Sequence, residues 1–274
     1  MGVFKHVWGQ GVIDLERRDL AALKLKRCMD SLKASAGSAL EIGCGAGMFI
    51  RSFKAHAPAF DCHAGDIDEA SIKLAKTFND GVSYTVFNAE SLPYEDGRFD
   101  VVMLFDIVEH VENIGKLLDE IMRVSRKGAT IHIYVPCEKE PLTIHWLLWK
   151  LRIGHNLKKK HAGHIQRLTK KCFVDMVREK GFEIMGVEYS TYLIGQLIDI
   201  AYYACQEIVP LKKKLMNAHA SKNISEGGDP ILTSALKGVI NPYGVPFRFY
   251  LTTDTGGKGP DIVGPAVKTT ARRK

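Results

Sequence analysis

Short apolar runs alternate with longer amphipathic stretches from residue 39 to residue 136. This alternation is typical of βα units, in which parallel strands form a sheet and the intervening helices cover its faces. The pattern therefore predicts an α/β fold for this part of the chain. The predicted strands are 39–43, 59–65, 82–89, 99–105 and 129–136, and the predicted helices lie near 47–56, 69–78 and 113–126.

The segments on either side of this region are less regular. Thr169 suits the N-cap of a further helix and Gly181 suits its C-cap. A section rich in glycine and proline near the C-terminus leaves two positions for a last strand. The predicted elements here are helices at 15–32 and 169–182, a strand at 182–189, and a last strand at either 246–254 or 261–269.

Composition excludes several classes of protein. A chain of 274 residues, 46% hydrophobic and 25% charged, is long enough to bury a sizeable core without disulfides or structural metals. Its six cysteines show neither a regular spacing nor a CxxC pair, which argues against a disulfide framework and against a zinc site. The opening MGVFKHVWGQGVIDL lacks the apolar core of a signal peptide, so we expect a cytoplasmic protein.

The net charge of +7 gathers in basic clusters at 158–160, 212–214 and 272–274. Such clusters suit a nucleic acid or an anionic membrane, although solvated charge explains each of them more simply. Two apolar segments with basic neighbours, 144–154 and 192–210, accompany them. Polar and acidic residues in the second argue against a spanning helix and favour a helix that covers an active site, with core packing as the alternative. Both segments together predict a weak peripheral membrane contact or entry of a lipophilic acceptor.

The segment ALEIGCGAGMF places Gly43, Gly45 and Gly47 between a predicted strand and a predicted helix. Glycines at such a turn accept positive φ angles and let a ligand approach the backbone beside free helix N–H groups. A dinucleotide fingerprint would need a glycine where Met48 or Ile50 stands, and a P-loop would end in Gly-Lys-Ser or Gly-Lys-Thr. The turn therefore predicts a nucleotide-like ligand without phosphates.

Two acids complete this pattern. Glu41 precedes the turn, which favours a ligand that carries an amine. Asp66 stands about 20 residues past the turn, where a carboxylate can accept both hydroxyl groups of a ribose. We predict ligand contact for Glu41 and Asp66, whereas Asp68 is predicted to be the N-cap of the following helix.

Four segments, LEIGCGAG, GDID, NAESLPYEDGRFDVV and FDIVEHV, together resemble the class I S-adenosylmethionine-dependent methyltransferases. The resemblance is to the small-molecule branch, which includes the ubiquinone-biosynthesis O-methyltransferases, and covers 37–136 closely and 164–190 more loosely. It implies a Rossmann-like, doubly wound, mostly parallel seven-stranded sheet in the order 3-2-1-4-5-7-6, with the seventh strand antiparallel. The implied divisions are an N-terminal helical segment at 1–36, the cofactor-binding core at 37–190, an inserted helical cap at 191–245, and the last strand with a C-terminal tail at 246–274.

The resemblance also implies roles around S-adenosylmethionine. The three glycines would bring the backbone under its methionine part, with Cys44 between them as a small filler. Glu41 would be oriented toward the ammonium group. Asp66 would hold the ribose hydroxyls, and Ile67 would pack on one face of the adenine.

Three more residues are implied near the nucleoside. Asn88 replaces an aspartate that is usual in the family and keeps an acceptor oxygen for the adenine amino group, while the amide of Ala89 would meet a ring nitrogen. Phe105 would lie near the adenosine or the reacting sulfur. The predicted cofactor-binding residues are Glu41, Gly43, Cys44, Gly45, Gly47, Asp66, Ile67, Asn88, Ala89 and Phe105.

The string FDIVEHV holds the predicted catalytic residue, His110. Displacement at a sulfonium methyl group needs alignment, and a base only when the acceptor must lose a proton. Orienting the helix start and the cofactor loop is an equally good interpretation of His110. Asp106, Glu109 and His110 look like the metal string of ubiquinone-pathway O-methyltransferases, but aspartate is shorter than the usual glutamate, and we predict no metal. His161 and His164 are predicted to form a wall on the substrate side.

These features predict methyl transfer from S-adenosylmethionine to a small or lipophilic acceptor, with oxygen as the favoured atom and nitrogen or carbon as alternatives. An RNA methyltransferase would commonly carry an RNA-binding module or an Asn/Asp-Pro-Pro-Tyr string where this chain has FDIVEH, so nucleic acid is not the expected partner. A noncatalytic protein that keeps the fold and binds RNA or another chain is a further alternative. The intact Glu41, glycine turn and Asp66 argue against it.

Overall fold

The computed structural model describes residues 9–190 except 18, 33, 142 and 153–161, together with 197, 200 and 266–273. The chain forms two compact units. The first comprises Met1–Val135, Lys171–Glu188 and Lys268–Lys274, and the second comprises Pro136–Lys170 and Tyr189–Val267.

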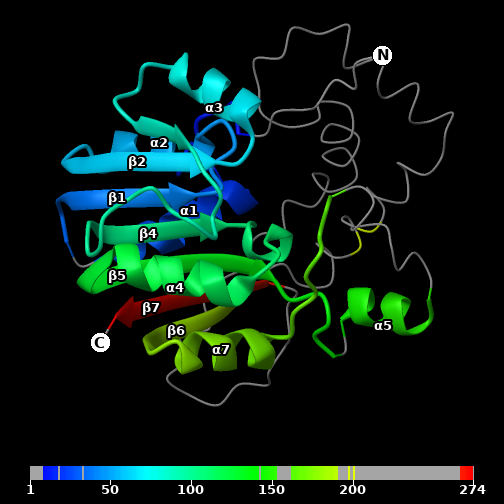
Figure 1. Cartoon of the computed structure of the whole chain (residues 1–274). Helices are drawn as coiled ribbons and strands as arrows, with labels where there is room; N and C mark the ends of the chain where they lie inside the picture. Colours follow the sequence, from blue (N-terminus) through cyan, green and yellow to red (C-terminus); the bar gives the residue numbers. More distant parts are fainter. Residues whose placement is uncertain are drawn as a thin grey trace, which may run out of the picture. The chain divides into compact units, whose positions relative to one another are not determined.

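A mostly parallel sheet forms the centre of the first unit (Figure 1). Its strands lie in the order β3-β2-β1-β4-β5-β7-β6, which is the order that the family resemblance implies. Strands β1 to β5 pair in parallel, whereas the arrow of β7 points the opposite way in Figure 1. The strands are β1 (Gly37–Ile42), β2 (Phe60–Asp66), β3 (Ser83–Val86), β4 (Phe99–Phe105), β5 (Ser125–Pro136), β6 (Phe182–Ser190) and β7 (Ala266–Arg273).

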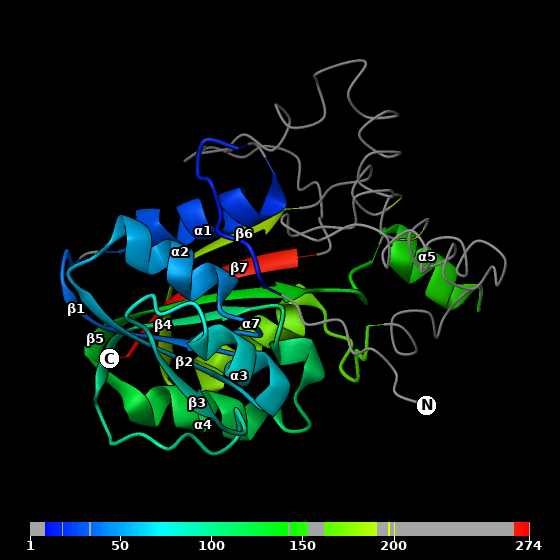
Figure 2. The ribbon, with the colours of Figure 1, turned by 90° about the horizontal axis from the view of Figure 1, so that it is seen from above.

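Helices cover both faces of this sheet. Figure 2 shows α1 and α2 on one face and α4 and α7 on the other. Coverage on both faces explains why β4 is buried and apolar at every position except Asp100. The helices are α1 (Leu20–Asp30), α2 (Met48–His56), α3 (Glu69–Lys76), the 3-10 helix η1 (Val108–His110), α4 (Ile114–Val124), α5 (Ile144–Lys150) and α7 (Lys170–Glu179).

Side-chain caps fix the beginnings of most of these helices. Asp19 caps α1, and Asn113 caps α4. Asp68 accepts a hydrogen bond from the backbone N–H of Ser71 (3.1 Å), so its predicted role as the N-cap of α3 is confirmed. By contrast, α2 begins after Gly47 and η1 after Ile107, and neither has a cap from that residue's side chain.

The boundary between α4 and β5 differs from the prediction. We predicted a helix near 113–126. The helix instead ends at Val124, because Ser125 adopts an extended backbone (ψ 135°), and its hydroxyl donates a hydrogen bond to the carbonyl of Ile121 (2.6 Å). Ser125 already pairs with Phe99 of β4, and the register then shifts before the ladder continues. Gly128, with a φ of 81°, lies within this shift.

The last strand in the described residues, β7, lies at the second of the two predicted positions. β7 overlaps the second of them, 261–269, but begins only at Ala266 and extends to Arg273. Residues 261–265 of this predicted position fall outside the described residues. Residues 272 and 273, which we assigned to a basic tail, lie in a strand. The other predicted position, 246–254, falls outside the described residues.

The described part of the second unit includes α5 and the segment that leads into α7. The hydroxyl of Thr143 caps α5 by accepting from the N–H of Trp146 (3.1 Å). The carboxylate of Glu140 accepts from the N–H of Lys170 (2.7 Å), at the first residue of α7. The predicted cap at 191–245 and the clusters at 158–160 and 212–214 fall almost entirely outside the described residues.

None of the helices in the described part of the chain is both long and apolar enough to cross a membrane.

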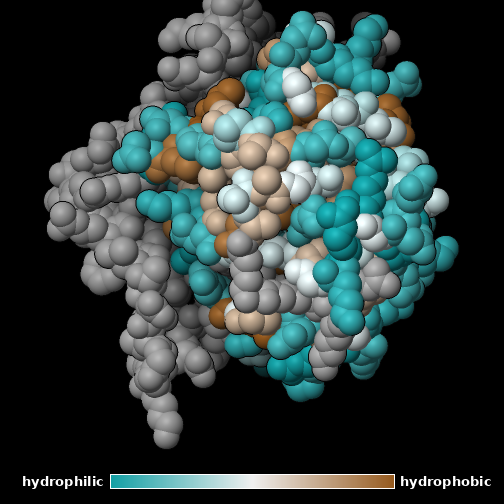
Figure 3. All heavy atoms as spheres, turned by 90° about the vertical axis from the view of Figure 1, so that its left-hand side faces the viewer, coloured by the Kyte–Doolittle hydropathy of each residue, from teal (hydrophilic) through white to brown (hydrophobic). Residues whose placement is uncertain are grey.

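Figure 3 views the end of the sheet at which β1, β2 and β4 begin. Hydrophilic side chains cover large areas of this face, and apolar side chains form smaller groups between them. Asp100 has a structural role at this end of the sheet, because it forms an ion pair with Arg126 (2.5 Å) and accepts a hydrogen bond from the N–H of Ser38 (2.9 Å). Ligands of open parallel sheets bind at the opposite end, beyond the carboxyl ends of the strands.

Candidate functional site

The glycine turn connects β1 to α2 and adopts the predicted backbone conformation. Gly43, Gly45 and Gly47 have φ angles of 75°, 55° and 85°, in the region that favours glycine. A Cβ at Gly43 would lie 2.6 Å from Cγ1 of Ile107, and a Cβ at Gly47 would lie 2.5 Å from the hydroxyl of Tyr84. The backbone angle and the available space therefore both require glycine at these two positions.

Cys44 lies inside this turn. The N–H groups of Gly43 and Cys44 both donate to the carbonyl of Gly65 at the end of β2, at 2.8 and 3.1 Å. Burial raises the pKa of the Cys44 thiol well above its usual range, so little thiolate forms. These observations support the interpretation of Cys44 as a small filler of the turn.

Glu41 is the acid that precedes the turn. It is 1% exposed, and its Oε2 accepts a hydrogen bond from the N–H of Ile50 (2.8 Å), in the first turn of α2. Glu41 thus provides the side-chain cap that Gly47 cannot provide. Burial raises the pKa of the Glu41 carboxyl well above its usual range, and a nearby cation would favour its ionised form.

Asp66 closes the turn from the end of β2. One carboxylate oxygen accepts from the N–H of Gly45 (2.8 Å), and the other accepts from the N–H of Asp68 (2.9 Å). A carboxylate can accept about four hydrogen bonds, so each oxygen retains capacity for a ligand hydroxyl. The neighbouring Ile67 is 71% exposed, which leaves an apolar surface open beside the acid.

Asn88 and Ala89 follow β3 in a tight turn. The side-chain oxygen of Asn88 accepts from the N–H of Glu90 (2.9 Å), and Asn88 forms an isolated bridge with Ser91. Asn88 is exposed and Ala89 is half-buried. The oxygen of Asn88 thus already has one local partner, and a contact with a ligand would use its second lone pair.

Phe105 ends β4 and is 5% exposed. Its ring stacks on that of Phe49 in α2, with the ring centres 4.0 Å apart. Ile107, two residues later, packs against Gly43. The turn after β4 is therefore held against the glycine turn, although the partner of Phe105, Phe49, was missed from the sequence because only the fold brings α2 and β4 together.

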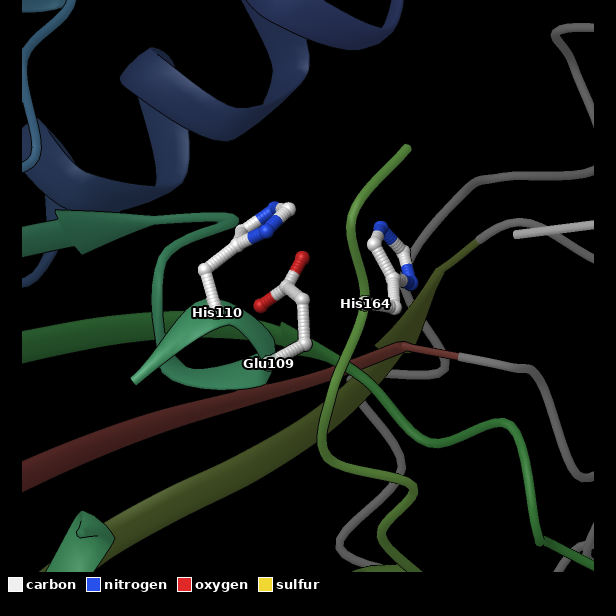
Figure 4. A group of neighbouring side chains, drawn as sticks. All are labelled: Glu109, His110 and His164. Atoms are coloured by element: carbon white, nitrogen blue, oxygen red, sulfur yellow. The ribbon is translucent and has the colours of Figure 1, made fainter. Parts of the chain in front are cut away.

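Glu109 and His110 follow in η1 (Figure 4). Glu109 is 1% exposed, whereas the His110 side chain is exposed and its backbone N–H donates to the carbonyl of Ile107 (2.9 Å). A carboxylate oxygen of Glu109 and a ring nitrogen of His110 lie within 4.8 Å of each other. The imidazole is thus accessible to a ligand and has a buried acid as its neighbour.

His164 belongs to the second unit, and His161 lies outside the described residues. The Nδ1 atom of His164 lies 2.6 Å from a carboxylate oxygen of Glu138, which is 6% exposed. The other oxygen of Glu138 lies 3.9 Å from the guanidinium of Arg167. Glu138 therefore fixes the orientation of the His164 ring within this unit.

Arg51 is a contributor that the sequence analysis missed. Its Nη2 donates to the carbonyls of residues 9, 10 and 11 at 3.1, 2.7 and 2.8 Å. Its guanidinium lies 3.8 Å from the ring centre of Phe78. A single buried arginine thus holds the segment 9–11 beside the glycine turn. An arginine on the buried face of an amphipathic helix is the only sequence signal that could have identified it.

Comparisons with known proteins agree with this arrangement. Residues 40–133 match the family described as "Methyltransferase domain". The chain is 30% identical to norajmaline N-methyltransferase of Rauvolfia serpentina over 119 residues, which are 41% of this chain and 40% of that protein. It is 31% identical to a ubiquinone biosynthesis O-methyltransferase of Nitrobacter winogradskyi over 115 residues, 40% of this chain and 43% of that protein. The chain thus spans about two fifths of the length of these relatives.

A solved structure shares the fold at lower identity. An S-adenosylmethionine-dependent methyltransferase of Thermotoga maritima superposes with a TM-score of 0.57 and 17% identity, covering 93% of this chain and 89% of that one. Residues 40–133 thus match a methyltransferase domain, the solved structure shows the same fold, and S-adenosylmethionine is the cofactor that such a domain implies.

The donor set at the carboxyl ends of the strands fits this cofactor. Asp66 has acceptor capacity for a ribose, and Ile67 offers an apolar surface for a base. Glu41 is a buried acid at the end of β1 that an ammonium group would compensate. The turn contains no lysine or arginine for a phosphate, which agrees with a nucleoside cofactor without phosphates.

Proposed function

We propose that the protein transfers the methyl group of S-adenosylmethionine to a small or lipophilic acceptor, preferentially on oxygen. The arrangement at the end of β2 supports this proposal most directly. Asp66 fixes the glycine turn through the N–H of Gly45 and keeps acceptor capacity, and Ile67 lies exposed beside it. Asn88 and Ala89 are assigned to the adenine side of the same site, and Glu41 to the ammonium side.

The residues of the chain align the reactants and handle the proton. Bound S-adenosylmethionine supplies a methyl group on a positively charged sulfur. The stacked rings of Phe105 and Phe49 form an apolar wall near the turn, which limits the access of water. Where the acceptor is a hydroxyl, His110 would take its proton as the oxygen is methylated. The nearby carboxylate of Glu109 stabilises the resulting imidazolium.

Nitrogen is the second candidate for the methylated atom. One of the relatives named above is an N-methyltransferase and another is an O-methyltransferase, and their identities to this chain are almost equal. For a protonated amine, His110 would first take a proton, which frees the lone pair of the nitrogen. The proposal for oxygen therefore rests on the ubiquinone-type string around η1.

The cofactor assignment is tested by calorimetry. We expect S-adenosylmethionine and S-adenosylhomocysteine to bind with micromolar dissociation constants, each equivalent to about −8 kcal/mol. NADH serves as the control and should give no heat, because the turn lacks the third glycine of a dinucleotide site. Binding of NADH with no heat from either sulfur ligand would overturn the assignment.

The acceptor is sought in a separate experiment. Incubation with a methyl-labelled cofactor and a cell extract would reveal the acceptor as a labelled small molecule.

We also propose a weak contact between the second unit and anionic lipid. None of the residues of α5 is buried, and Leu147, Trp149 and Leu151 are 47%, 42% and 58% exposed. Lys150 lies over the ring of Trp146, 5.0 Å from its centre, so basic and aromatic groups alternate here. Apolar side chains beside basic ones suit the boundary between lipid headgroups and acyl chains.

Vesicle flotation tests this contact. The protein should float with phosphatidylserine vesicles at low salt and remain behind with pure phosphatidylcholine, since each basic residue adds about 1 kcal/mol near an anionic surface. Added salt should weaken the effect. Replacing Trp149 and Leu151 together by glutamate should abolish flotation, whereas Met185→Glu, an exposed apolar position on β6, should not. A wild-type protein that ignores phosphatidylserine at low salt would end the proposal.

A further inference from the structure

A buried ion pair joins α1 to the turn after β4. Lys24 of α1 forms a hydrogen bond and an ion pair with the carboxylate of Asp106, and its side chain is 8% exposed. The ammonium also lies 3.8 Å from the ring centre of Tyr134 on β5. Burial lowers the pKa of Lys24, but Asp106, Tyr134 and Glu109 together raise it above the usual value. Lys24 therefore stays charged and balances one nearby carboxylate.

Asp106 stands in an unusual backbone conformation. Its φ angle is 52°, in the left-handed region that residues other than glycine seldom adopt. Its N–H donates to the carbonyl of Tyr134 (3.0 Å), which ties this backbone to β5. Such conformations cost about 1–3 kcal/mol and persist only where surrounding contacts maintain them. Lys24 and Tyr134 are the contacts that do so here.

The Asp106 carboxylate is fixed but remains accessible. Its side chain is 42% exposed, in contrast with 8% for its partner Lys24. Lys24 thus holds the carboxylate from the protein side, while solvent reaches it from elsewhere. An acid arranged in this way can accept a further hydrogen bond without rearrangement.

The position of Asp106 places it at the reacting end of the proposed site. Phe105 before it stacks on Phe49, and Ile107 after it packs against Gly43 of the glycine turn. His110, the proposed base, follows in η1. Within this group Asp106 and Glu109 provide two carboxylates, and Lys24 provides one buried cation.

We propose that Asp106, positioned by Lys24, binds a hydrogen-bond donor of the methyl acceptor, so that the site takes neutral or cationic acceptors and rejects anionic ones. The inference rests on the proposed function and specifies its substrate class. An N–H or O–H group of the acceptor donates to the exposed carboxylate. A carboxylate or phosphate on the acceptor would meet Asp106 and Glu109 at close range and would be repelled. Lys24 is a positioning residue, because it acts through Asp106.

Three small probes of similar shape test the charge preference. Benzylamine, benzyl alcohol and benzoate share a ring and differ in charge and in their donor groups. Their dissociation constants are measured by ligand-observed NMR on the protein saturated with S-adenosylhomocysteine. We expect benzylamine to bind about tenfold more tightly than benzoate, with benzyl alcohol in between, as expected for a partly exposed charge. The binding of S-adenosylhomocysteine is measured in a separate experiment. A failure of cofactor binding, which would contradict the proposed function, is thus distinguished from a failure of the charge preference.

Variants of Lys24 and Asp106 then test whether this ion pair causes the preference for benzylamine over benzoate. Asp106→Asn should bring the benzylamine and benzoate constants within about threefold of each other, since the amide carries no charge. Lys24→Arg should retain the wild-type ratio, and Lys24→Met should weaken the binding of benzylamine. Asp119→Asn is the matched control on the exposed face of α4, where Asp119 pairs with Lys180 (2.7 Å). Thermal unfolding of each variant shows whether it is folded.

The ratio of the benzoate and benzylamine dissociation constants, measured on the wild-type protein, is enough to overturn the inference. Benzoate binding as tightly as benzylamine, or absence of saturable benzylamine binding, would contradict it without any variant. A tenfold ratio that survives in folded Asp106→Asn would also contradict it. In that case the ion pair would only attach α1 to the sheet, and Lys24→Met would lower the melting temperature and leave the ratio unchanged.

Discussion

Replacing His110 by alanine is expected to lower the maximal rate of methylation of a hydroxyl acceptor about a hundredfold or more, with little change in cofactor affinity. The imidazole is exposed at the carboxyl end of β4, and the buried carboxylate of Glu109 lies within 4.8 Å of it. Loss of a base removes proton transfer but leaves the glycine turn and Asp66 intact. Turnover with a methyl-labelled cofactor and calorimetry with S-adenosylhomocysteine give the two quantities separately.

The control is His56→Ala, at the far end of α2, where the ring contacts only the carbonyl of Ser52 among the polar contacts described (2.8 Å). This variant should keep both turnover and affinity. A fall in cofactor affinity with normal turnover at saturation would instead show that His110 only orients η1 and the glycine turn.

The parts of the fold that were predictable depend on local sequence. The run 99–105 is apolar at every position except Asp100 because β4 is covered on both faces, and its predicted bounds agree with the strand in the structure. The glycine turn was recognisable because positive φ angles and close packing restrict those positions to glycine. The capping role of Asp68 was recognisable because it depends on residues only three positions apart.

The parts that were missed depend on contacts distant in sequence. Lys24 and Asp106 are 82 residues apart, and Lys24 lies in an ordinary amphipathic helix. The helical spacing did indicate that Lys24 is buried. It lies four residues before the buried Cys28 and so shares the same face of the helix. Arg51 binds carbonyl groups of residues 9–11, which have no side-chain signature at all. Sequence spacing cannot show such pairs, because only the fold brings them together.

The cofactor site was predicted as a set of roles, and the structure adds the interactions that support those roles. Glu41 was predicted from a ligand's ammonium group, yet in this structure it caps α2 through Ile50. Asp66 was predicted from a ribose, yet it also holds the N–H of Gly45. Both acids therefore also organise the turn through hydrogen bonds to its backbone, and a turn fixed in this way lowers the cost of ordering on binding.

Asp66→Ala should weaken the binding of S-adenosylhomocysteine by about 1.5–3 kcal/mol, or about 10- to 150-fold, because charged hydrogen bonds to the ribose are lost. Calorimetry measures the change. Asp61→Ala, at the other end of β2, is the matched control, since Asp61 pairs only with His63 among the contacts described (2.8 Å). An unchanged dissociation constant in Asp66→Ala would remove this acid from the site.

Asp66 also supports the turn, so a loss of affinity alone does not separate direct contact from indirect damage. The 2′-deoxy analogue of S-adenosylhomocysteine makes the distinction, because it lacks one hydroxyl that Asp66 would accept. If the contact is direct, the wild-type protein should prefer the ribose ligand by about tenfold, and Asp66→Ala should show almost no preference, which is the coupling expected of groups that touch. If the variant retains the wild-type preference, the hydroxyl binds elsewhere. Asp66 would then act only through the N–H groups of Gly45 and Asp68.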